Sequence, residues 1–128
     1  MEPISNELNR IAREIVDSAF KVHKTLGPGL LESAYEACMA HELSLRNVIF
    51  RTQVALPVVY EGVKLDAGFR IDMLVEEKVI VEMKASEKII PLHEAQLLTY
   101  LRLSNLRLGL LINFNVLLIK DGIKRMVI

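Results

Sequence analysis

The chain has 128 residues, of which 52% are apolar and 25% are charged, and its 16 basic residues balance its 16 acidic residues. This length and composition exclude a disordered chain and predict a single folded domain over residues 1–128. The zero net charge excludes a general electrostatic attraction to nucleic acid or to an anionic membrane. A polyanionic partner therefore has to be held by a local site.

The amino-terminal segment "MEPISNELNR" lacks the basic and apolar regions of a signal peptide, and the single Cys38 cannot form an intramolecular disulfide. The longest apolar stretch, residues 108–119, is too short to cross a membrane and contains two asparagines. We therefore expect a cytoplasmic protein that makes no membrane contact.

Two helices are predicted in the first third of the chain. Apolar residues recur at spacings of three and four from about residue 5 to residue 26, which indicates an amphipathic helix that Gly27-Pro28-Gly29 ends. A second helix is predicted over about residues 30–45. The buried face expected for it holds Leu31, Ala34, Cys38 and Leu45.

The residue pattern in the middle of the chain predicts β-strands. Turns at residues 61–62 and 76–78 separate three predicted strands, over residues 48–60, 63–75 and 79–85. Pro57 cannot donate to a ladder, so we expect its strand to lie at a sheet edge or to carry a bulge.

The last third returns to helix and then to strand. Residues 92–103 have helical spacing, and Asn105 is the expected terminator. Strands are predicted over residues 106–114 and 116–120, with Asp121-Gly122 as a type I′ turn into the carboxy-terminal strand 123–128. This order predicts an α/β fold with a central mixed β-sheet flanked by helices.

The predicted hairpin at residues 70–85, "RIDMLVEEKVIVEMKA", has charged residues among apolar ones. Their presence has to be explained, because charged side chains are rarely buried without a partner. A three-residue loop at 76–78 places Val75 opposite Val79 and Asp72 opposite Glu82. Strand side chains alternate between faces. The charged face then holds Arg70, Asp72, Glu82 and Lys84, and the apolar face holds Ile71, Met73, Val81 and Met83.

Two interpretations of this charged face are open. Facing carboxylates destabilise a sheet unless a positive group lies between them, and Mg²⁺ is typically held by one or two carboxylates together with water and substrate phosphate. Lys84 would then stabilise charge at the attacked phosphate or orient the attacking water. Alternatively, Lys84 and Arg70 neutralise Asp72 and Glu82 in an ion-pair ladder on a solvated face.

Residues elsewhere in the chain match the first interpretation. Glu32 lies in the first turn of the second helix, and Gln96 and Tyr100, four residues apart, share a face of the third. Taken singly, such residues also occur as partners of the helix dipole or as packing residues.

The motifs in their order resemble a family of nucleases. Asp72 followed after nine residues by Glu82-Met83-Lys84 is similar to the D…E-x-K core of the PD-(D/E)xK superfamily, with Ile71 in place of the proline that often precedes the aspartate. Residues 29–35, "GLLESAY", are similar to the G-x-x-E-x-x-Y element of the GxxExxY proteins, a branch of that superfamily. The segments "GFRIDMLVEEKVIVEMKA", "HEAQLLTYLRL" and "LGLLINF" also resemble that family, so the resemblance covers nearly the whole chain.

The resemblance implies a restriction-endonuclease-like core and Mg²⁺- or Mn²⁺-dependent hydrolysis of phosphodiester bonds in nucleic acid, with DNA the preferred expectation. It implies that Asp72, Glu82 and Glu32 bind the metal ion and that Lys84 serves the chemical step. Gln96 and Tyr100 match a Q-x-x-x-Y element that borders the active site and orients substrate.

Two other functions stay open at this point. A non-enzymatic module of the same fold would bind nucleic acid, or an unidentified protein partner, in a way that does not depend on Asp72 and Glu82. A small scaffold would form a homodimer through an exposed apolar strand such as residues 123–128.

Overall fold

A computed structural model describes residues 2–65 and 69–128 of the chain. Its helices are α1 (Asn6–Leu26), α2 (Glu32–Leu45), α3 (Pro91–Ser104) and the short 3-10 helix η1 (Ile119–Gly122). Its strands are β1 (Phe50–Ala55), β2 (Val58–Tyr60), β3 (Val63–Leu65), β4 (Arg70–Val75), β5 (Val79–Lys84), β6 (Leu108–Asn113) and β7 (Ile123–Val127). Within these ranges no helix has the length and apolar character that crossing a bilayer requires.

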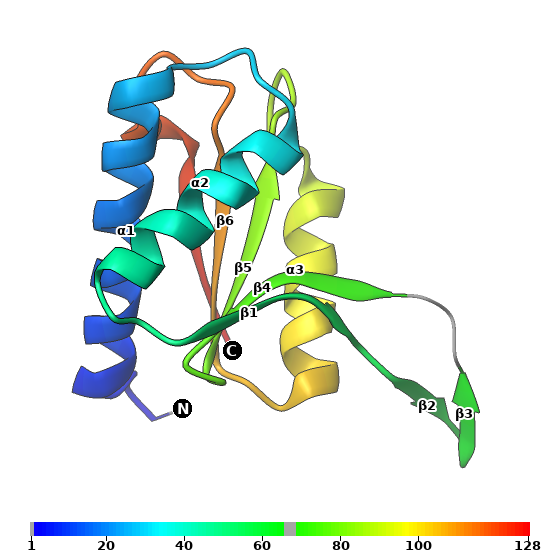
Figure 1. Ribbon diagram of the computed structural model, residues 1–128. Coiled ribbons are helices and arrows are strands. Elements are labelled where there is room, and N and C mark those ends of the chain that lie inside the picture. Colours follow the sequence, from blue (N-terminus) through cyan, green and yellow to red (C-terminus); the bar gives the residue numbers. More distant parts are fainter. Residues whose placement is uncertain (1, 66–68) are drawn as a thin grey trace.

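Five of the strands form one sheet in the order β1-β4-β5-β6-β7, in which β5 and β6 are parallel and the other neighbours are antiparallel. Helices α1 and α2 cover one face of the sheet and α3 covers the other, while the β2–β3 hairpin projects away from the sheet (Figure 1). The predicted α/β class with a mixed sheet flanked by helices is confirmed.

The sheet separates two apolar cores. On one face, α1 and α2 pack through residues such as Ile15 and Met39 against β-strand residues that include Val81 and Leu110. On the other, Leu97 and Leu101 of α3 are buried in a cluster with β-strand residues. Each core needs one apolar stripe of a helix, which is what spacings of three and four along the chain provide.

The central hairpin has the predicted register. Val75 pairs with Val79, Leu74 with Ile80 and Met73 with Val81 across the three-residue loop. One prediction for its faces is wrong: Ile71 belongs to the cluster on the α3 side, whereas Met73 belongs to the cluster on the α1 and α2 side. The alternation breaks at Asp72, because regular pairing between β4 and β5 ends just before that residue.

The other two predicted strands of the middle region are each divided. Residues 48–60 form β1 and β2 on either side of Leu56-Pro57, and β1 is an edge strand, as Pro57 predicts. Residues 63–75 form β3 and β4, and residues 66–68 between them lie outside the described part of the chain. Glu61-Gly62 forms the turn between β2 and β3, as predicted.

The predicted strand at residues 116–120 and the predicted turn at Asp121-Gly122 are wrong. Residues 119–122 form η1, and Leu117 before them is 88% exposed. The free edge of β6 is already paired with β7, from Leu108 with Val127 to Ile112 with Ile123. The apolar run at 116–120 therefore has no edge of β6 left to join.

The buried face of α2 also differs from the prediction. Leu31 is 76% exposed and Leu45 is 61% exposed, whereas Tyr35, Met39 and Leu43 are completely buried. These three residues follow a spacing of four, so they form a single stripe against the sheet. The helix ends lie beyond that contact, which leaves their leucines in solvent.

Candidate metal and nuclease site

Two carboxylates come together where β4 and β5 separate. The backbone N–H of Asp72 donates to Glu82 Oε1 at 3.1 Å, and the backbone N–H of Met83 donates to Asp72 Oδ2 at 2.9 Å. Each carboxylate thus accepts from a backbone group of the opposite strand beyond the end of the regular ladder. Because a strand backbone moves little, these bonds fix both side chains.

Burial and mutual repulsion perturb Glu82. Glu82 is only 4% exposed. Its pKa is raised to about 8, mainly by burial and next by the negative charge of Asp72. The hydrogen bond from the Asp72 backbone and the positive charge of Lys84 act in the opposite direction on this pKa, with smaller effect. The pair is therefore short of positive charge.

The ion-pair ladder does not form. None of the four described side chains of the charged face, Arg70, Asp72, Glu82 and Lys84, makes a salt bridge with another. The guanidinium of Arg70 instead donates to the backbone carbonyl of Gln53 at 3.3 Å. The carboxylates are left without the neutralising partners that the alternative interpretation requires.

Lys84 ends β5 two residues after Glu82, which places it on the same side of the strand. Its residue is half-buried, and its carbonyl accepts the backbone N–H of Phe114 at 2.9 Å. The chain just beyond it is held by Asn113, which is 1% exposed. The side chain of Asn113 accepts from the N–H of Ser86 at 3.2 Å and donates to its carbonyl at 2.9 Å.

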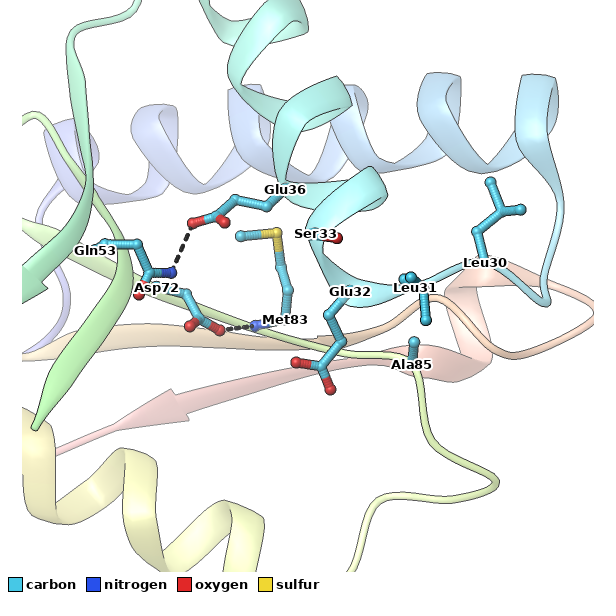
Figure 2. Close-up of a pocket in the computed structure, with 9 residues that line it drawn as sticks. All are labelled: Leu30, Leu31, Glu32, Ser33, Glu36, Gln53, Asp72, Met83 and Ala85. Atoms are coloured by element: carbon cyan, nitrogen blue, oxygen red, sulfur yellow. Dashed lines mark hydrogen bonds between the residues drawn. The ribbon is translucent and has the colours of Figure 1, made fainter.

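An open pocket of about 640 Å³ lies between the start of α2 and strands β4 and β5 (Figure 2). Asp72, Glu32 and Glu36 line it, together with Leu30, Leu31, Ser33, Gln53, Met83 and Ala85. Glu32 is exposed at the first position of α2. Among the described residues no three carboxylate, imidazole or thiol groups are gathered closely enough to form a metal-ligand cluster. The structure thus brings Asp72 and Glu82 together, while Glu32 shares the pocket of Asp72 without joining the pair.

Tyr35 holds the loop that presents Glu32. Its hydroxyl donates to the carbonyl of Gly27 at 2.6 Å and accepts from the N–H of Leu30 at 3.1 Å. Its ring stacks on Phe114, with centroids 4.5 Å apart. The backbone of Gly29 has φ of 99°, which a residue with a side chain rarely adopts. The glycine and the tyrosine of the G-x-x-E-x-x-Y pattern therefore shape one tight loop, and the glutamate starts the helix after it.

Helix α3 brings Tyr100 near the carboxylates. Tyr100 is mostly buried, and its pKa is raised by burial first and then by the negative charges of Glu82 and Asp72. Gln96, half-buried, lies one helical turn earlier on α3. The two residues therefore lie on the Glu82 side of the sheet, across from the α2 pocket.

Neither Glu36 nor Gln53 was predicted to take part in the site. The amide nitrogen Nε2 of Gln53 donates to Glu36 Oε1 at 2.9 Å, beside Asp72 in the pocket (Figure 2). Glu36 follows Glu32 by one helical turn, which is a usable signal. For Gln53 the sequence holds no signal, because its role depends on a backbone bend with φ of 50° inside a strand.

A five-stranded mixed sheet with helices on both faces and an acidic pair at an opened central hairpin defines the restriction-endonuclease-like class of α/β fold. A family model described as the PD-(D/E)XK nuclease superfamily matches residues 9–126, and the chain belongs to this superfamily. Nucleases of the superfamily act on nucleic acid and generally use divalent metal ions. No curated protein and no solved structure gives a significant match.

Proposed function

We propose that this chain is a Mg²⁺- or Mn²⁺-dependent nuclease that hydrolyses phosphodiester bonds in nucleic acid, with DNA as the preferred substrate. Asp72 and Glu82 would hold the metal ion, and Glu32 would complete its acidic surroundings from α2. A bound divalent ion supplies Lewis acidity toward a phosphate oxygen and a nucleophilic water at neutral pH.

The observation that carries this proposal is the uncompensated acidic pair. Asp72 and Glu82 are fixed by backbone donors, and Glu82 is buried with a pKa of about 8. Two crowded carboxylates without a salt bridge to Arg70 or Lys84 favour a cation between them. Carboxylate oxygens are the ligands that Mg²⁺ prefers, so the donor set fits the ion.

The remaining residues take roles that follow from their positions. Lys84, on the side of Glu82, would stabilise negative charge on the attacked phosphate or orient the attacking water. Tyr100 and Gln96 would orient the substrate or the neighbouring carboxylate from α3. We assign the chain to the GxxExxY branch through Gly29, Glu32 and Tyr35, and we treat residues 1–128 as one nuclease domain that acts in the cytoplasm.

The proposal is tested first by metal binding, because a cleavage assay depends on choosing the right substrate. Mn²⁺ is titrated by calorimetry into the natural protein, into a Asp72→Ala, Glu82→Ala double variant and into Glu87→Ala, which removes an exposed carboxylate just beyond β5. We expect binding in the natural protein and in Glu87→Ala and its loss in the double variant, with all three folded by circular dichroism. Equal binding in all three proteins would refute the metal site.

Cleavage is then measured on single-stranded and duplex DNA and RNA with Mg²⁺ or Mn²⁺. Lys84→Ala is expected to retain Mn²⁺ binding and to lose cleavage, by about a hundredfold or more if it stabilises charge in the transition state. Undiminished cleavage by both Lys84→Ala and the double variant would eliminate this mechanism. Nucleic-acid binding that persists without metal and in the double variant would favour the non-enzymatic module instead.

A further inference from the structure

Gln53 has an unusual backbone for its place in the fold. Among the described residues it alone combines a side chain and a positive φ, 50°, with a position inside a strand. The other non-glycine residues with positive φ lie in turns or just after helices: Asn47, Glu61, Glu76, Glu77 and Asn105. A residue with a Cβ adopts this region at a cost, so the surroundings of Gln53 must hold it there.

The bend at Gln53 does not shift the strands. Thr52 pairs with Met73 and Val54 pairs with Ile71, so the register is the same on both sides and Gln53 lies opposite Asp72. The bend therefore adds no residue and changes only the direction of the Gln53 peptide and side chain. Its carbonyl accepts from Arg70, and its amide Nε2 donates to Glu36 on α2.

Strand β4 is irregular at the same point. Ile71 packs on the α3 side and Met73 on the α1 and α2 side, so the alternation of faces fails around Asp72. The carboxylate of Asp72 consequently lines the α2 pocket and accepts from the backbone N–H of Met83 at 2.9 Å. Figure 2 shows Glu36, Gln53 and Asp72 side by side, with Asp72 directed toward Met83.

We infer that Gln53 and Glu36 are positioning residues for Asp72. Their hydrogen bond holds β1 in its left-handed bend against α2, and the bend leaves β4 free to turn the Asp72 carboxylate toward the Met83 amide and the pocket. This inference rests on the proposed metal site of Asp72 and Glu82, and it adds the residue pair that sets the direction of one ligand.

The loss of the Gln53–Glu36 hydrogen bond should affect the local structure around Asp72 more than the stability of the whole fold. Gln53 is exposed and Glu36 is half-buried, so their hydrogen bond contributes little to the stability of the whole fold. Its removal should therefore loosen Asp72 and its bond to Met83, and leave distant core amides such as that of Leu110 as protected as before.

The test compares Gln53→Ala, Glu36→Ala and the conservative Glu36→Gln, whose amide oxygen still accepts from Gln53. Amide hydrogen exchange, followed by NMR on the metal-free proteins, reports the Met83 N–H and Leu110. We expect exchange at Met83 about tenfold faster in both alanine variants, unchanged exchange at Leu110, and near-natural behaviour in Glu36→Gln. Calorimetry is expected to show about a tenfold loss of Mn²⁺ affinity in Gln53→Ala, which changes no charge.

Unchanged exchange at Met83 in Gln53→Ala would overturn the inference, as would equal acceleration at Met83 and Leu110, which reports general loosening. A loss of Mn²⁺ affinity in Glu36→Gln with none in Gln53→Ala would also overturn it, because charge would then be the cause. If the natural protein binds no Mn²⁺, the proposed metal site fails, and the exchange at Met83 still decides whether Gln53 positions Asp72.

Discussion

At the scale of single residues, Glu82 is a buried acid that lies beside a second acid, Asp72. The pKa of Glu82 is raised from its ordinary value of 4.5 to about 8. Between these two pH values the folded protein therefore holds a proton on Glu82 that the unfolded chain has lost. A buried glutamate has no packing advantage over an apolar residue. The proposed metal ion would make the ionised form favourable and would so account for a glutamate at the centre of the sheet.

The pH dependence of stability tests this conflict in the metal-free protein. The stabilisation that Glu82 contributes is complete below pH 4.5 and is lost as the pH rises to about 8, because the folded state alone retains the proton in that window. Urea denaturation from pH 5 to pH 8 is expected to show the free energy of unfolding falling by up to about 1.4 kcal/mol per pH unit, with a smaller slope as the pH approaches 8. Glu82→Gln cannot titrate, so its slope should be flatter, and equal slopes in both proteins would contradict the assignment.

Tyr35 belongs to the G-x-x-E-x-x-Y pattern, and its role in this structure is to hold the loop before α2. Tyr35→Phe keeps the ring stack on Phe114 but removes the bonds to Gly27 and Leu30. We expect the free energy of unfolding to fall by about 0.5–1.5 kcal/mol, because the half-buried Gly27 carbonyl and the Leu30 N–H lose a hydrogen-bond partner. Urea denaturation measures this, and Tyr60→Phe on the exposed β2–β3 hairpin is the matched control, with no change expected. A Tyr35→Phe variant as stable as that control would show that the loop does not depend on the hydroxyl.

At the scale of elements, local sequence patterns correctly predicted the features that depend on neighbouring residues, namely a hairpin register and the positions of two helices. The three-residue loop and the alternation of apolar residues set the register of β4 and β5, and the helical spacings located α1 and α3 to within a residue or two. The break at Asp72 could not be predicted from local patterns, because the two residues that we infer to position Asp72, Gln53 on β1 and Glu36 on α2, meet only in the folded chain. The run at 116–120 was misassigned because its β-like composition says nothing about whether a strand edge is free.

The connection from β6 to β7 depends on Gly122, at the end of η1. A Cβ at this position would lie 2.1 Å from the carbonyl oxygen of Asn113, so a side chain forces the two segments apart. Gly122→Ala is expected to lower the free energy of unfolding by about 2–3 kcal/mol, measured by thermal or urea denaturation. Asp121→Ala, one residue earlier and exposed, should change it by less than about 0.5 kcal/mol. Similar values for the two variants would mean that the backbone relaxes around the added methyl group.

At the scale of the whole molecule, the balanced charge gives any substrate little long-range attraction. Recognition then has to come from groups gathered at one place, and the fold gathers them by letting the central hairpin open at its Asp72 end. The order of motifs along the chain was enough to predict the class of fold and to select Asp72, Glu82 and Lys84 as the residues to follow. The hairpin register also predicted that Asp72 and Glu82 would face each other, whereas the contact between Gln53 and Glu36 depends on how α2 packs against β1, which no local pattern encodes.

The two hydrogen bonds between the Asn113 side chain and the Ser86 backbone lower the entropy that Lys84 would lose on binding a substrate. The Asn113 amide bonds both backbone groups of Ser86, and the N–H of Phe114 donates to the carbonyl of Lys84, so the main chain that bears the lysine is held by hydrogen bonds without any ligand. Ordering a lysine side chain costs up to about 2 kcal/mol, and a free backbone would add about 1–2 kcal/mol. In the proposed function, only the side-chain torsions of Lys84 would then have to be ordered when a phosphate binds.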